Sequence, residues 1–198
     1  MLLHQIIKPS ADSPGSPAVP LICMPSSAGD GRAIFDRLAA AAEAHLTFPA
    51  LLVAPDLSEP NAQEQWPAAF AKLRQQHHLT DRGLVFGHGA GARHAQHFAL
   101  DHPDAVIACA ALSADAWASV SDSPDPGALR PVRWLIGCGL EEPAGAMQRA
   151  ERLQVELAEV GCLVDFLDWD GGPSELSAHA LENTVRFFND LQSAKQAA

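Results

Sequence analysis

A glycine-rich turn between an apolar run and a helical pattern is the place in this chain where chemistry is first expected. Residues 84–95 read LVFGHGAGARHA, so the turn is Gly87-His88-Gly89-Ala90-Gly91. A strand, a G-x-S-x-G turn and a helix together expose a nucleophilic serine on a strained elbow. Gly89 stands at the serine position and brings no side chain. The pattern predicts the shape of a nucleophile turn without its nucleophile.

The same turn has a second interpretation as a dinucleotide site. Gly87, Gly89 and Ala92 fit G-x-G-x-x-A, which can hold a pyrophosphate at a helix N-terminus. That motif also needs an acid about 20 residues further on, at the end of the next strand. Asp115 lies in roughly that place, but beyond the expected strand and past Ser113. The motif usually opens its fold, whereas two strand–helix units precede it here, so a nucleotide-binding module is the weakest alternative.

Two serines and a histidine could supply chemistry from other positions. Ser26 and Ser27 follow an early strand, and His88 is next to the apex of the turn. A Ser26–His88 pair would be a relocated catalytic pair, whereas the plainer interpretation is loop serines and a packed histidine.

A second group of polar side chains lies on the helix after the turn. His94, His97 and Asp101 share one helical face at i, i+3 and i+7, a spacing that could hold a metal ion. Without a fourth ligand in view, a solvated helix face is favoured. We therefore expect no metal and no cofactor.

Alternating apolar strands and amphipathic helices must position these residues. The apolar runs predict strands over 1–8, 18–24, 50–57, 82–87, 105–112, 132–138 and 163–169. Apolar residues at helical spacing predict helices around 34–42, 66–78, 95–102, 150–160 and 181–188. Near-continuous apolar strands alternating with helices indicate a mostly parallel sheet covered on both faces. We therefore expect a single α/β domain over 1–198, with its core at about 18–191 and a frayed tail over 193–198.

The composition excludes several classes of partner. The chain has 198 residues, 13 basic and 24 acidic, and a formal net charge of −11. Such an acidic surface repels phosphate backbones and anionic lipid, so neither nucleic acid nor a membrane is expected as a partner. The N-terminal residues lack a secretory signal. Four cysteines without metal-like spacing, Cys23, Cys109, Cys138 and Cys162, fit buried thiols in a reducing cytoplasm.

From about residue 18 to 191 the sequence resembles the α/β-hydrolase superfamily, especially its small lidless esterases and depolymerase-like members. The segments that carry the resemblance are the elbow with its helix, DHPDAVIACAALS after it, and AERLQVELAEVGCLVDFLDWDGG before the last helix. The resemblance implies a three-layer fold without a lid domain. In that family the nucleophilic serine follows the fifth strand, an acid follows the seventh, and a histidine lies after the eighth.

Carried over to this chain, those three positions are Gly89, Glu142 (or Glu141) and Pro173. Only the acid is kept, because glycine has no nucleophile and proline no proton acceptor. The resemblance therefore implies an esterase-like scaffold without its Ser-His-acid triad, and the vestigial acid is expected to be exposed or paired with a surface cation.

The groups that stabilise an oxyanion in the family are kept in this chain. The backbone N–H groups of Ala90 and Ser26 correspond to the family's donors, so Ser26, Ser27, His88, Gly89 and Ala90 form the candidate binding site. A pseudo-hydrolase that binds a small carboxylate, an ester or a protein is the leading interpretation. An active hydrolase with displaced catalytic residues is the alternative, and a homo-oligomer stays open.

Overall fold

The apolar runs form one seven-stranded sheet in the order β1-β3-β2-β4-β5-β6-β7. The computed structural model describes residues 2–7, 17–25, 31–55, 70–172 and 176–196. Only β1 is antiparallel, pairing with β3, and every other described pairing is parallel. The strands are β1 Leu2–Ile7, β2 Val19–Met24, β3 Ala50–Pro55, β4 Gly83–His88, β5 Val106–Leu112, β6 Arg133–Gly139 and β7 Leu163–Trp169.

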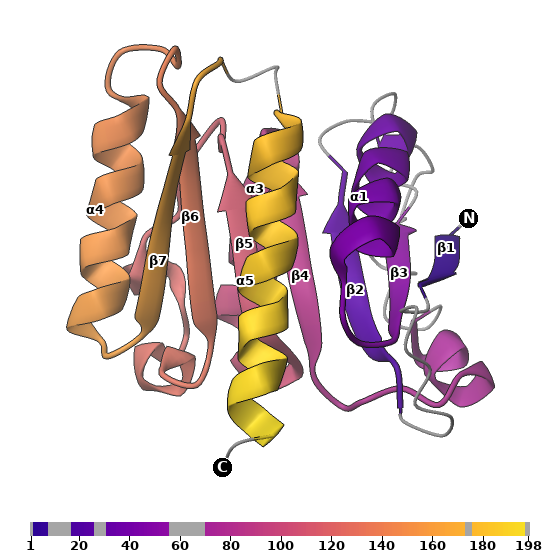
Figure 1. Ribbon diagram of the computed structural model, residues 1–198. Helices are drawn as coiled ribbons and strands as arrows, with labels where there is room; N and C mark the ends of the chain where they lie inside the picture. Colours follow the sequence, from indigo (N-terminus) through magenta and orange to yellow (C-terminus); the bar gives the residue numbers. More distant parts are fainter. Residues whose placement is uncertain (1, 8–16, 26–30, 56–69, 173–175, 197–198) are drawn as a thin grey trace.

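Helices cover both faces of the sheet and make three layers (Figure 1). Side chains of a strand alternate between the two faces, so each buried strand contributes to two separate cores. In β4, Leu84 and Phe86 belong to the core under α1 and α5, whereas Val85 belongs to the core under α3 and α4. The helices are α1 Gly31–His45, α3 Ala90–Asp101, α4 Ala146–Glu159 and α5 Ala178–Gln196.

The predicted order of elements is confirmed along the described residues, with small differences at the ends. β4 continues through the first glycine of the elbow to His88. Residues 70–76 are helical as expected, while Trp66 lies outside the described residues. The expectation of a frayed tail is wrong for residues 193–196, because α5 extends to Gln196. No helix among the described residues is long and apolar enough to cross a membrane.

The crossing of β4 and α3 is close enough to require glycine at two positions. A Cβ atom at Gly87 would lie 2.1 Å from the Gly91 carbonyl oxygen, and one at Gly91 would lie 2.2 Å from the Met24 oxygen. Both contacts are to backbone atoms, which cannot rotate away. The first and last glycines of the elbow are therefore needed to pack α3 against β4 and β2.

Replacing Gly87 with alanine is expected to destabilise the fold by about 3 kcal/mol or more, because the added methyl overlaps backbone atoms. Gly172→Ala is the matched control, since the Glu141 oxygen at 3.7 Å is the one atom among the described residues that its Cβ would meet. Urea unfolding followed by circular dichroism measures both variants. Equal stability of Gly87→Ala and Gly172→Ala would show that the close crossing is absent in solution.

Candidate functional site

The elbow predicted at the end of the central strand is confirmed. β4 ends at His88, Gly89 follows with φ 59° and ψ −128°, and α3 begins at Ala90. The Gly89 N–H donates to the Leu112 carbonyl at 3.0 Å, and the Gly89 carbonyl accepts the Ala92 N–H at 3.0 Å. A residue with a side chain is strained in this backbone conformation, at a cost of about 1–3 kcal/mol. Glycine at the apex keeps the turn of a nucleophile elbow and removes its strain.

The start of α3 presents backbone donors at this apex. The first N–H groups of a helix have no partner within it, and the helix dipole favours negative charge there. No side chain caps this end of α3, and Gly89 and Ala90 are both partly exposed. The N–H of Ala90 is the first of these donors and has no partner within α3. Ser26 and Ser27, which would complete the site, lie outside the described residues.

The acid position lies in a tight turn after β6. The Glu142 carboxylate accepts the Gly139 N–H at 3.3 Å and the Cys138 thiol. Burial, together with the neighbouring Glu142, raises the pKa of Cys138 to about 11. The expectation of an exposed or cation-paired acid is therefore wrong for Glu142, whereas Glu141 is exposed. Glu142 is half-buried, and its hydrogen bonds stay within its own turn.

The acid turn packs against the loop that would carry the base. The Glu141 N–H donates to the Gly171 carbonyl at 3.0 Å, and the Leu140 N–H donates to the Trp169 carbonyl at 2.9 Å. A hollow of about 430 Å³ lies beside this contact, lined by Leu140, Asp168, Trp169, Asp170, Ser177 and His179. The acid turn therefore contacts the loop that leads to position 173, while Pro173 itself lies outside the described residues.

His88 is buried on the face of the sheet that α1 and α5 cover. Its side chain is 6% exposed, and its Nε2 atom has no hydrogen-bond partner among the described residues. Burial, and then the positive charge of Arg37, lower the pKa of His88 to about 4. The imidazole is therefore neutral at pH 7.

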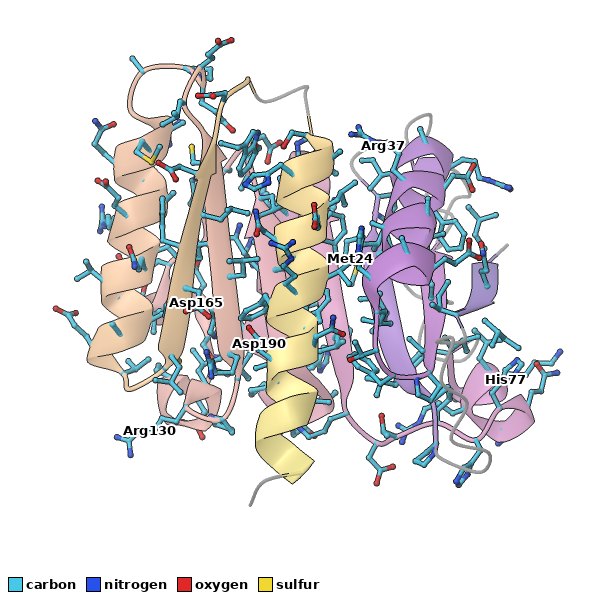
Figure 2. All side chains as sticks on the ribbon, viewed as in Figure 1. Met24, Arg37, His77, Arg130, Asp165 and Asp190 are labelled. Atoms are coloured by element: carbon cyan, nitrogen blue, oxygen red, sulfur yellow. The ribbon has the colours of Figure 1, made fainter. Side chains whose placement is uncertain are left out.

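Arg37 lies on α1, where that helix approaches the start of α5, and its positive charge acts on His88. Its guanidinium Nη2 donates a hydrogen bond to the Leu176 carbonyl, which joins the two helices at the carboxyl edge of the sheet (Figure 2). Neither the spacing nor the composition of the sequence identified Arg37. It is 52 residues from Gly89 in the chain, and only the packing of α1 beside α5 brings it to this edge.

Ser113 is a second residue at this edge of the sheet that no sequence motif identifies. It follows β5 directly, is 2% exposed and has φ 49°, and it is the one described residue other than glycine with a positive φ. Its N–H donates to the Gly137 carbonyl at 2.8 Å, but its Oγ has no partner among the described residues. A serine without a hydrogen-bonded base is not activated as a nucleophile.

The cysteine thiols are unsuited to nucleophilic attack. All four are buried, and burial raises the pKa of Cys23 to about 12 and the pKa values of Cys109 and Cys162 above their ordinary value. Since the thiolate is the reactive form, these side chains are inert at pH 7.

The polar face of α3 lines a separate cleft. His94 and Asp101 border a volume of about 510 Å³ between α3 and the helix at 70–76, with Ile22, Met24 and Phe98 as apolar walls. No group of three or more metal-binding side chains occurs among the described residues, His94, His97 and Asp101 included. Burial comes first among the causes that lower the pKa of His94, and the nearby Asp115 opposes that shift. Asp115 lies three residues beyond β5 rather than at its end.

Comparison with known proteins agrees with this arrangement. No protein-family model matches the chain, and no curated protein matches it. Solved structures do match. The BES protein of Bacillus cereus has a TM-score of 0.72 at 15% identity, over 94% of this chain and 90% of that one. A Bacillus cereus carboxylesterase has a TM-score of 0.68 at 14% identity, over 96% and 95%. The fluorophosphonate-binding serine hydrolase F of Staphylococcus aureus has a TM-score of 0.63 at 17% identity, over 95% and 91%.

The chain therefore has the α/β-hydrolase fold. Counted in the described sheet, the elbow follows β4, the acid turn follows β6 and the Gly171 loop follows β7. The resemblance to the superfamily places these three positions after the fifth, seventh and eighth strands. Each strand number in the described sheet is therefore one lower.

The burial of neutral His88 predicts an acid-sensitive fold. The pKa of His88 is about 4 in the folded protein, below the ordinary value of 6.5, so the unfolded chain binds the proton first. The stability linked to this group is lost as the pH falls from 6.5 towards 4, by up to about 3 kcal/mol. His88→Gln is expected to flatten the slope of unfolding free energy against pH between 7 and 5.

Urea unfolding at a series of pH values measures this slope. His102→Gln, at an exposed histidine beyond the far end of α3, is the control and should keep the wild-type slope. A His88→Gln slope equal to that of the wild type would refute the buried neutral state.

Proposed function

We propose that this protein is a pseudo-hydrolase, which uses the elbow of an esterase scaffold to bind a small molecule without cleaving it. The observation that carries the proposal is Gly89 at the apex, in the backbone geometry of a nucleophile and without a side chain. The glycines on either side of it preserve the elbow by contact with backbone atoms.

The chemical cost of this replacement is large. In a triad the base removes the proton of the nucleophile, and the acid orients the base. Loss of the nucleophile alone costs on the order of 10⁶-fold in turnover, about as much as loss of the whole triad. The Glu142 carboxylate accepts a hydrogen bond from its own turn, and this further supports the view that the scaffold has no acid to orient a base.

The described residues offer no convincing substitute. The Ser113 hydroxyl has no base, and the thiols are buried with raised pKa values. His88 is neutral, but it follows Leu84 and Phe86 onto the face under α1 and α5. His88 therefore supports a catalytic Ser26–His88 pair only because it is next to the elbow in the sequence.

The preserved donors support a ligand with a polar oxygen. The N–H of Ala90 and the dipole of α3 point to a small carboxylate or an ester carbonyl as the bound group. Because all four cysteines are buried free thiols, we place this activity in a reducing compartment such as the cytoplasm.

The proposal predicts that the purified protein hydrolyses p-nitrophenyl acetate and p-nitrophenyl butyrate no faster than background. Gly89→Ser alone should not restore turnover, because a serine hydroxyl without a base is too weakly acidic to attack at pH 7. Gly89→Ser with Pro173→His should give modest activity at most, since the new histidine must reach the serine within hydrogen-bond distance.

Release of p-nitrophenol is followed at 405 nm, with circular dichroism as a check that each variant is folded. Clear hydrolysis by the unmodified protein, abolished by Ser26→Ala or His88→Ala, would replace the pseudo-hydrolase with an enzyme whose catalytic residues are displaced.

A further inference from the structure

The cleft beside α3 lies on the face of the sheet and is separate from the elbow. It has a volume of about 510 Å³ and lies between α3 and the helix at 70–76. Leu73 of that helix packs with Leu51 and Val53 of β3 in a small core of its own, whereas α3 packs mainly over β4 and β5. Since β2 lies between β3 and β4 in the sheet, the strip of β2 between the two helices forms the floor of the cleft.

The floor and walls of this cleft are apolar and carry several aromatic rings. Ile22 and Met24 lie on the floor, and Phe70 and Phe98 lie on the two helical walls. The Phe98 ring also contacts the His102 ring, with centroids 5.1 Å apart, so two rings line the α3 wall. Aromatic rings and a methionine sulfur are favourable neighbours for a further aromatic ring. The volume is within the range of about 300–1,000 Å³ that small-molecule sites have, so a molecule of one or two rings fits.

His94 adds a polar group to the cleft. It lies on α3, one turn before Phe98, and borders the cavity. Burial, and then the positive charge of Arg93, lower the pKa of His94 below its ordinary value of 6.5, while Asp115 opposes the shift. The imidazole is therefore neutral at pH 7. A neutral imidazole has one N–H donor and one nitrogen acceptor, so it can form a hydrogen bond with a hydroxyl group on a bound ring.

The charged side chains at the cleft favour a neutral ligand over an anion. Arg74 and Asp81 both line the cleft and form an ion pair with each other, so their charges cancel. Asp101 adds an exposed carboxylate at the end of α3. An anion would meet this net negative charge, and its transfer to the apolar walls would cost solvation free energy.

We propose that this cleft binds a small neutral aromatic molecule with one hydroxyl group, a phenol, with its ring against Met24 and Phe98 and its hydroxyl at His94. The site is independent of the elbow, because no residue of the turn at 87–91 is among the described residues that line the cleft. The proposal therefore adds a second ligand site to the scaffold.

NMR of the methionine methyl groups locates the bound molecule. The chain has three methionines, and of the two that the structure describes, Met24 lines the cleft (labelled in Figure 2) while Met147 lies on α4. With ¹³C-labelled methionine methyl groups, 4-fluorophenol is expected to shift the Met24 signal through its ring current and to leave the Met147 signal in place. Spectra of Met24→Leu and Met147→Leu assign the two signals.

Ligand-observed ¹⁹F NMR compares three compounds of similar size and different polarity. 4-Fluorophenol is expected to bind at least about threefold more tightly than fluorobenzene, the gain from one hydrogen bond. It should bind at least about tenfold more tightly than the anion 4-fluorobenzoate, which would have to bury its charge.

His94→Leu should remove the advantage of 4-fluorophenol over fluorobenzene and leave the affinity for fluorobenzene as in the wild type. His97→Leu is the matched control, because His97 is also half-buried on α3 but is not among the described residues that line the cleft. It should keep the wild-type affinities for both compounds. Circular dichroism checks that each variant is folded.

Each part of the proposal has an outcome that would overturn it. No shift of the Met24 signal, or an equal shift of the Met147 signal, would overturn the site. Binding of 4-fluorobenzoate as tight as that of 4-fluorophenol would overturn the neutral ligand class. An undiminished affinity of His94→Leu for 4-fluorophenol would overturn the hydrogen bond to His94. Any of these results leaves the function proposed for the elbow unaffected.

Discussion

The backbone contact where β4 crosses α3 is the constraint on which the site depends. A methyl group at Gly87 or Gly91 would overlap carbonyl oxygens of α3 and β2, so the crossing exists only with glycine at both positions. This crossing forces the chain to reverse within one residue, and Gly89 has the positive φ that the reversal demands. The direction of α3, its free N–H groups and the exposed apex all follow from this one contact.

Once that geometry is fixed, the side chains around the elbow determine whether it can catalyse a reaction or only bind a ligand. The acid that would orient a base is held by the Gly139 N–H and the Cys138 thiol, and so stabilises its own turn. The histidine nearest the apex is buried and neutral, its Nε2 atom has no partner among the described residues, and the positive charge of Arg37 lowers its pKa further. None of these groups is placed to move a proton for a nucleophile at Gly89, which is the physical argument for the binding elbow that we propose.

The sequence was sufficient for the fold because the fold depends on patterns that are local in the chain. Apolar runs marked the seven strands, and the G-x-G-x-G turn placed the elbow after the central one. The prediction for Glu142 failed because its partners come from the tight turn after β6, whose backbone geometry has no signature in composition. Arg37 and Ser113 were missed for a related reason. The packing of α1 beside α5 and the unusual φ of Ser113 appear only in three dimensions.

The central claim is that the elbow carries no activated nucleophile, and a covalent reagent for activated serines tests it most directly. The protein is incubated with a fluorophosphonate, and intact-mass spectrometry then measures its mass. An active serine hydrolase of the same fold is the positive control. The account predicts that the active hydrolase gains one phosphonyl group while this protein keeps its unmodified mass. A stoichiometric adduct that maps to Ser26, Ser27 or Ser113 would contradict it and identify the nucleophile.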